Sequence, residues 1–490
     1  MRRETFSFCR RPAALLCLGL AVLLAAAGCA EPIRQTIDRP FIAEPVSPET
    51  VFGEATLGPE ADGKVKPVSA PADEGPLTLE QSLAMARLVS PSLDTADQGY
   101  AGAMWSRWQA ITAFLPTAST TYQVVHSDDF RPVDLRHDQW TWQNRVSQPI
   151  FSGGRNVANY LLSQLGLAAA DIKRAQARED LLLAVKEAFY GILASEKALK
   201  VAKTTVVNLT SHLNVARNFY EVGMAPQNQV LQAEVELAKA QQEEINQSRN
   251  LVVNQARLNI LLRRPVDHPV KLRDELKHDP FPLTMERCQE VSLRDNPEIR
   301  LGLNAVESGA KSVDVARANL YPEVVVSWSN TSTGADASAH GGPTSSSSWN
   351  MAAVASFNFW EWGRSKAGVE ISKVQLNQAI NALTSLEDAT KLELTSNYQT
   401  LVSAGRNISV AAKAVESAAE DLRMVSERYQ EQVATNTEVL DAQTRYSEAQ
   451  YEYYQSLYNY NLSWAAIERT MGRRVTPAGL APEERAPARP

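Results

Sequence analysis

Apolar residues recur with heptad spacing through residues 361–472, and this pattern predicts a long α-helical hairpin. The spacing is 4-3-4-3-4 on the first arm and 3-4-3-4-3-4 on the second, after a reversal near residues 429–436. Such rows are coiled-coil seams, so the two arms are expected to pack against each other. No proline, which would break a helix, occurs between Pro343 and Pro477. The seam residues are Ala411, Val415, Ala418, Leu422, Val425 and Tyr429 on the first arm, and Val439, Ala442, Tyr446, Ala449, Tyr453, Ser456 and Tyr460 on the second.

An earlier stretch of the chain repeats this hairpin. Residues 220–232 match the turn at residues 429–441 in outline, 209 positions earlier (429 minus 220). Residues 77–91 likewise match residues 283–297 at an offset of 206 (283 minus 77). Self-similarity of this kind indicates an internal duplication. The expected organisation is a first repeat at residues 77–264, a linker at residues 265–282 and a second repeat at residues 283–476.

Both repeats carry the same elements in the same order. The first helix begins at Thr78 and Gln81, which have the spacing of a capping box, and is expected to bend at Pro91. Two strands follow, then a helix of about 67 residues, ~100 Å long, and a shorter helix. The two shorter helices of a repeat, placed end to end, would match one long helix. The expected strands are residues 117–126, 139–150, 323–330 and 348–360, and the first repeat's long and closing helices run from Arg155 to about Asn218 and over residues 227–263.

The expected strands alternate between apolar and polar side chains. In residues 139–150, Trp140 and Trp142 alternate with Thr141 and Gln143. This pattern is typical of strands in a membrane β-barrel, although a soluble hairpin with one buried face has the same pattern. Tryptophan rings gather at membrane interfaces. The tryptophans expected to form interfacial belts are Trp140, Trp142, Trp349, Trp360 and Trp362.

Four strands cannot close a transmembrane barrel, since the smallest has about eight. An open sheet edge in lipid would leave backbone groups unpaired. Copies of the chain must therefore share the barrel: two copies would fill its interior with side chains, and three copies would begin to leave a passage. The expected fold is α+β and mostly α, with long antiparallel coiled-coil helices that continue the barrel as a hollow cylinder.

The N-terminus has the pattern of a secretion signal. Residues 1–28 carry four arginines before an apolar stretch and end in small residues next to Cys29. They resemble a bacterial lipoprotein signal, in which the cysteine becomes the lipidated first residue; an ordinary signal peptide with a nearby cysteine is the alternative. Residues 29–76 contain eight prolines and are expected to form an extended, lipid-anchored linker. Residues 477–490 are expected to be a disordered tail.

Composition excludes several classes of function. The formal net charge of −7 becomes about −10 without the first 28 residues, which carry +3. An acidic chain with no basic cluster argues against a nucleic-acid partner. The six histidines are scattered, and the common motifs of metal-dependent, nucleophilic and nucleotide-binding enzymes are absent. We therefore expect no enzymatic activity and no cofactor or metal, apart from the lipid on Cys29.

Several motifs at matching places of the two repeats resemble one known family. The strand exits read Gly153-Gly154-Arg155 and Trp362-Gly363-Arg364, and the turns end in Val230-Leu231-Gln232 and Val439-Leu440-Asp441. With the paired repeat starts, these motifs resemble the TolC family of bacterial outer membrane channels, particularly its lipoprotein branch (OprM-like and NodT-like), over residues 77–476. The resemblance implies a homotrimer in outer membrane lipid, with a twelve-stranded barrel and a periplasmic α-helical tunnel. It also implies a periplasmic membrane-fusion adaptor and an inner-membrane transporter, most often of the RND type.

The same resemblance implies a gate at the turn of the second hairpin. In the family, acidic residues ring the constriction at the periplasmic end, and Glu438 and Asp441 match them. In a trimer, six carboxylates would select cations and raise some of one another's pKa values. Thr435 and Glu438 also have the spacing of a capping box, which would serve only to start a helix. Tyr429 matches a tyrosine that latches the closed hairpin, or packs as a seam residue, and Gln432 stands where the family has glycine.

The expected function is that of a passive exit duct in a tripartite efflux system, which exports small molecules such as drugs or toxic compounds. One alternative is the outer membrane component of a type I protein secretion system, which the sequence does not exclude. A second is a structural periplasmic coiled-coil adaptor. The four amphipathic strands and the duplication argue against the adaptor.

Overall fold

The computed structural model describes residues 75–127, 137–340, 345–477 and 479–480, all within one compact unit that begins at Gly58. The expected signal peptide, Cys29 and most of the expected linker and tail lie outside these residues. The helices are α3 (Leu79–Val89), α4 (Pro91–Thr112), α5 (Arg155–Glu221), α6 (Gln227–Leu261), α7 (Met285–Asp295), α8 (Pro297–Ala318), α9 (Arg364–Gln430) and α10 (Asn436–Met471).

The order of elements confirms the duplication. In each repeat a short helix, a helix of 22 residues, two strands, a helix of 67 residues and a final helix follow one another. The first helix begins at a capping box in which the side chains of Thr78 and Gln81 bond to each other's backbone N–H groups. It ends at Ser90 because Pro91 starts a new helix, where a proline needs no hydrogen-bond partner. The bend predicted there is therefore a complete break.

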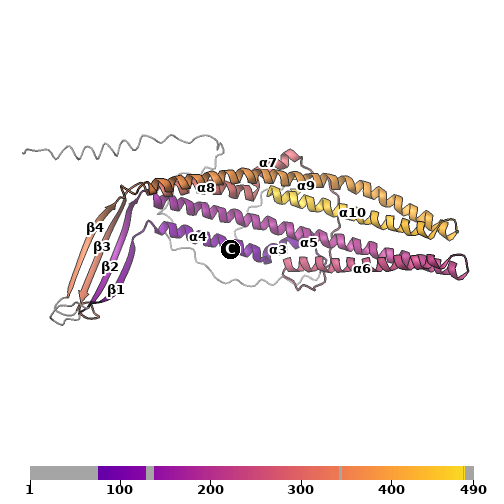
Figure 1. Cartoon of the computed structure of the whole chain (residues 1–490), viewed down its shortest axis with the longest axis horizontal. Coiled ribbons are helices and arrows are strands. Elements are labelled where there is room, and N and C mark those ends of the chain that lie inside the picture. The colour runs from indigo at the N-terminus through magenta and orange to yellow at the C-terminus, as the bar shows by residue number, and fades with distance from the viewer. Residues whose placement is uncertain (1–74, 128–136, 341–344, 478, 481–490) are drawn as a thin grey trace, which may run out of the picture. The chain divides into compact units, whose positions relative to one another are not determined.

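The helices form a layer in which short helices lie along long ones (Figure 1). Both α8 and α10 pack against α5 on one side and α9 on the other, and both α4 and α6 pack against α5. This confirms that the short helices of a repeat match one long helix end to end. All predicted seam positions of α9 and α10 are buried or half-buried, so the coiled-coil hairpin is confirmed.

The four strands form one antiparallel sheet in the order β1 (Thr117–Ser127), β2 (His137–Ser152), β3 (Glu323–Gly334) and β4 (Ser346–Ser356). Paired residues share a face of the sheet, and the register separates the two classes of side chain. Trp142 pairs with Tyr122, and Trp328 pairs with both Val146 and Met351, which makes one face mostly apolar, although Asn144 and Asn330 pair on it. The opposite face carries Ser119, Thr121, Gln143, Arg145, Ser329, Thr331 and Asn350.

The prediction for the last strand was wrong at its end. We expected a strand to Trp360, but β4 ends at Ser356 and residues 357–360 have no regular structure. Phe357 and Phe359 continue the apolar alternation past the strand. They lie exposed in the connection to α9 and are not paired with another strand. Alternation reports which side chains are apolar, and it does not report where the backbone pairing stops.

The two repeats meet where α10 ends. Lys186 of α5 and Glu468 of α10 form a buried ion pair there, and Glu468 also accepts a hydrogen bond from the backbone N–H of Val475 (2.7 Å). Arg469 bonds to Asp180 of α5 (3.0 Å) and Glu298 of α8 (2.6 Å). The contacts with Lys186 and Asp180 tie α10 to the first repeat.

The expected linker and the start of the expected disordered tail both pack near this junction. In the linker at residues 265–282, Val270 is buried and Leu77 pairs with Leu272 in a parallel bridge. At the C-terminus, Gly479–Leu480 (β6) pairs with Val475–Thr476 (β5), although residues 477–490 were expected to be disordered. The pairing forms because Val475 is buried and Leu480 packs against the same hydrophobic cluster.

Candidate functional site

The two hairpin turns have the same backbone geometry. In the first, the N–H groups of Gly223 and Met224 bond to the carbonyls of Tyr220 and Phe219. In the second, the N–H groups of Gln432 and Val433 bond to the carbonyls of Tyr429 and Arg428. Gly223 has φ +78° and Gln432 has φ +61°, so glutamine takes the left-handed conformation that glycine takes in the first turn. The tip geometry is thus kept despite the missing glycine.

We expect Gln432→Gly to stabilise the second turn, because a left-handed conformation costs a non-glycine residue about 1–2 kcal/mol and glycine's extra backbone entropy offsets part of that. Hydrogen exchange of the amides in the turn would slow up to roughly fivefold, the equivalent of about 1 kcal/mol. The matched change Gly223→Gln in the first turn should speed exchange there. Faster exchange in Gln432→Gly would contradict this account of the turn.

Glu438 and Asp441 lie one turn apart at the start of α10, and both are exposed. The predicted capping box is present: Thr435 Oγ1 accepts from the Glu438 N–H (3.3 Å), and Glu438 Oε1 accepts from the Thr435 N–H (3.3 Å). Glu438 Oε1 also accepts from the Thr435 hydroxyl (2.9 Å). The hydroxyl of Thr435 holds the pKa of Glu438 below its usual value. Within one chain, Glu438 therefore has the helix-starting role and remains ionised, and this arrangement leaves its charge facing solvent.

Tyr429 is buried between the hairpins. Its ring lies 4.9 Å from the ring of His212 and 5.6 Å from that of Phe219, both on α5. Its hydroxyl donates weakly to Gln229 Oε1 of α6 (3.5 Å), and burial raises its pKa. Tyr429 therefore packs as a seam residue and also contacts the first hairpin of the same chain. Its role as a gate latch stays a prediction.

The sequence interpretation missed the polar residues that join the hairpins near their tips. His212 of α5 bonds to Asn436 of α10 (2.7 Å), and Asn208 donates to Gln443 Oε1 (3.0 Å). Asn208, His212, Val215 and Phe219 follow one another at 4-3-4 spacing, so α5 has a second seam that faces α10. That spacing was the available signal, and it was hidden because half of the seam is polar.

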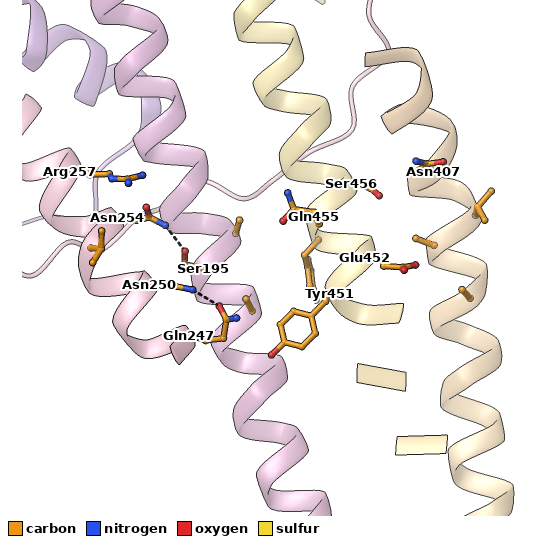
Figure 2. A pocket seen from close by; sticks show the side chains of 17 residues that line it. Ser195, Gln247, Asn250, Asn254, Arg257, Asn407, Tyr451, Glu452, Gln455 and Ser456 are labelled. Carbon is orange, nitrogen blue, oxygen red and sulfur yellow. Dashed lines mark hydrogen bonds between the residues drawn. The ribbon is translucent and has the colours of Figure 1, made fainter. Parts of the chain in front are cut away.

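A groove of about 890 Å³ crosses the helix layer between the hairpins (Figure 2). Amide side chains line it, among them Gln247, Asn254 and Gln455, and Asn254 Nδ2 donates to Ser195 Oγ (2.7 Å). The hydroxyl of Tyr451 is buried there and has no hydrogen-bond partner within the described chain, and burial raises the pKa of Tyr451 to about 12. The groove thus offers polar groups to an incoming surface.

The five tryptophans predicted as interfacial belts lie at two ends of the sheet. Trp140, Trp142 and Trp349 lie in the strand segments farthest from the helices, on the apolar face. Trp360 and Trp362 lie in the β4–α9 connection, with ring centroids 5.4 Å apart, and are 67% and 88% exposed.

The connections to the helices also match between the repeats. Trp362 and Gly363 have φ of +52° and +80°, as Gly153 and Gly154 have +63° and +87°. Both long helices thus begin after two left-handed residues. Among the described helices, none has a stretch long and apolar enough to cross a membrane.

The comparisons with known proteins agree with this geometry. A protein-family model described as outer membrane efflux protein matches residues 86–262 and 290–473, which are most of both repeats. The structure of CusC is 14% identical over 85% of this chain and 99% of its own, with a TM-score of 0.70. The outer membrane protein VceC of Vibrio cholerae is 17% identical (80% and 96% covered, TM-score 0.70). The open-state MtrE channel of Neisseria gonorrhoeae is 18% identical (80% and 88% covered, TM-score 0.68).

None of the curated proteins searched matches the chain. At these identities the solved structures establish the fold, a TolC-like helical layer with a small sheet. The family model covers well over half of the chain and establishes its class, which consists of channel proteins and not enzymes. The chain belongs to the outer membrane efflux protein family.

Proposed function

We propose that the chain is the exit duct of a tripartite efflux system and passively releases small molecules, such as drugs or toxic compounds, received from an inner-membrane pump. The observation that carries this proposal is that both layers of the fold have open edges on opposite sides. In the sheet, β1 and β4 each have one neighbour, and in the helix layer α4 and α6 are the outer helices on one side and α9 on the other. A closed ring of copies of the chain would pair the open edges of the sheet and cover those of the helix layer at the same time.

The side chains on the outer helices support that ring. α6 exposes Leu231, Val235, Ile245 and Val252, and positions 231, 235, 245 and 252 all fall on one heptad seam. The outer face of α9 also carries exposed apolar residues. Three copies would supply twelve strands, enough to leave a passage, whereas eight would leave an interior filled by side chains. The exposed large apolar residues of α9 are Ile371, Val374, Ile380, Leu392, Val410 and Met424.

The proposed partners are a periplasmic membrane-fusion adaptor and an RND-type inner-membrane transporter. The polar groove between the hairpins supports an adaptor contact, because the amide side chains that line it can bond to a docked helix. The apolar face of the sheet supports contact with outer membrane lipid. Lipidation of Cys29 is part of the proposal, and the mass of the mature N-terminal peptide tests it.

The acidic tip provides the test of the channel. Purified protein in planar bilayers should give a small, cation-selective conductance, and Glu438→Gln/Asp441→Asn should lower the selectivity for cations. Glutamine can replace glutamate in a capping box, so the start of α10 is kept while the charge is removed. The control Glu416→Gln/Glu420→Gln removes the same charge from exposed positions farther along α9 and should leave selectivity unchanged.

The outcomes of these recordings separate a channel with an acidic gate from a channel without one, and both from a structural adaptor. Conductance with unchanged selectivity would keep the channel and leave the two acids with a helix-starting role only. No conductance from well-folded protein would contradict the duct and favour a structural coiled-coil adaptor.

A further inference from the structure

His212 contacts the second hairpin on both sides of its turn. The side chain belongs to α5, in the first hairpin, and the residue is 9% exposed. Its Nε2 lies 2.7 Å from Oδ1 of Asn436, the first residue of α10. Its ring packs on that of Tyr429, near the end of α9, at 4.9 Å between centroids. A single side chain thus contacts the last turn of one arm and the first turn of the other.

A neutral ring is sufficient for these contacts. An amide oxygen only accepts hydrogen bonds, so Nε2 carries the proton and donates to Asn436. Asn436 in turn donates from Nδ2 to Gln232 Oε1 (3.1 Å) and to the carbonyl of Gln229 (3.4 Å), both on α6. The chain of bonds therefore runs from α5 through α10 to α6, and it is complete without any charge on the ring.

The surroundings of His212 oppose a positive charge. On α9 it faces Tyr429 and Arg423, which share a cavity of about 360 Å³ with it, and Arg423 is already paired with Glu420 and Glu427. On α10 it faces Asn436, Gln443 and Tyr446, and α6 contributes neutral amides. No carboxylate pairs with the ring within the described chain. Burial lowers the pKa of His212 below its usual value, although the bond to Asn436 opposes this.

The two ends of α10 are held by different chemistry. At its C-terminal end, ion pairs join it to α5, through Lys186 with Glu468 and Arg469 with Asp180. Near the tips, the described contacts between the hairpins are neutral hydrogen bonds and ring contacts. Of the bonded groups at the tips, the His212 ring has the ordinary pKa nearest to neutrality. Mild acid should therefore loosen the tip while the other end stays attached.

We propose that His212 is a pH-responsive fastener of the channel's periplasmic end: the neutral ring holds the second hairpin against the first, and protonation releases it. This inference rests on the proposed exit duct. A ring whose pKa is lower in the fastened state than in the released state favours release as the pH falls through the released-state value. Each unit of that difference shifts the ratio of released to fastened tips by up to about tenfold per copy.

The tip movement can be measured without reference to conductance. Spin labels at Met224→Cys and Gln432→Cys, whose native side chains touch, report the distance between the tips in a Cys288→Ala background. Between about pH 7.5 and about pH 5 we expect a long-distance population to grow in the labelled protein. With His212→Gln, which can still donate to Asn436 but cannot be protonated, the short distance should persist. A distance that does not change with pH, or one that changes equally in His212→Gln, would overturn the proposal.

Single-channel recordings test the link to the duct. The open fraction of the wild type should rise about tenfold or more over the same pH range, stay low in His212→Gln and be high at neutral pH in the permanently charged His212→Arg. His278→Gln is the matched control, since that exposed imidazole packs on Tyr460 instead of the tips and should leave the wild-type response intact. An open fraction that does not change with pH in a conducting wild-type protein would overturn the proposal that His212 is a pH-responsive fastener. Tips that separate in acid without any conductance support the fastener and contradict the exit duct.

Discussion

Lys186→Met is expected to destabilise the protein by about 3–5 kcal/mol, because it leaves Glu468 buried without its partner. The loss should depend on pH. Burial raises the pKa of the neighbouring Glu179, and Lys186 opposes this, so removing Lys186 should raise the pKa of Glu179 further. A carboxyl whose pKa is raised in the folded state makes the protein less stable as the pH rises. The difference in stability between the variant and the wild type should therefore be smaller in mild acid. Thermal unfolding followed by circular dichroism measures it.

The matched control is Lys186→Met/Glu468→Gln, which removes both charges. Glutamine keeps an acceptor for the Val475 N–H, which bonds to Glu468 Oε1 in the wild type. The double variant should recover most of the stability, since replacing both members of a buried ion pair by neutral groups is often close to neutral. Two results would contradict this explanation, in which the loss of stability comes from a buried carboxylate without its partner. One is a single variant as stable as the wild type, and the other is a double variant as unstable as the single variant.

Trp328→Arg should prevent assembly of the channel in the membrane. Trp328 lies in the middle of β3 on the apolar face, paired with Val146 and Met351. An arginine on the lipid face costs about 2–4 kcal/mol at the bilayer midplane, and every copy in the ring would bear that cost. The fraction of protein recovered as assembled complex from outer membranes measures the effect.

Two neighbouring changes separate charge from other causes. Ser329→Arg places the same side chain one residue further along β3 on the opposite, polar face, and should assemble. Trp328→Leu removes the indole ring without adding charge, and should also assemble. Equal loss of assembly in Trp328→Arg and Ser329→Arg would mean that the two faces do not differ as the register indicates.

Periodicity predicted those parts of the fold that depend on a single apolar row. The seams of α9 and α10 and the separation of the sheet into two faces follow from spacing in the sequence. They were predictable because burying one row of apolar side chains is the dominant favourable term in packing two elements. The family resemblance was then confirmed by the family model.

Features that depend on tertiary contacts were not predictable in this way. Lys186 and Glu468 lie 282 positions apart, and their charges alone gave no sign that both are buried together. The second seam of α5 escaped notice because Asn208 and His212 are polar, and buried polar residues are recognised only once their partners are known. The left-handed Gln432 is a similar case, since the surrounding turn imposes a conformation that its residue type disfavours.

The roles of Glu438, Asp441 and Tyr429 at a gate stay predictions. The capping box at Glu438 is present, and Tyr429 is buried against the first hairpin, but a ring of carboxylates involves several copies of the chain. The tryptophan belts likewise stay a prediction, because an interfacial belt is defined by the position of its side chains relative to a membrane.

The most direct test of the central claim is the number of chains in the assembled complex. Native mass spectrometry of the protein released from outer membranes in mild detergent measures it. The open edges of the sheet and of the helix layer predict three copies, which together supply twelve strands. A single folded chain would contradict the shared barrel. A complex of two chains would contradict the exit duct, because a barrel of eight strands is filled by its own side chains and leaves no passage.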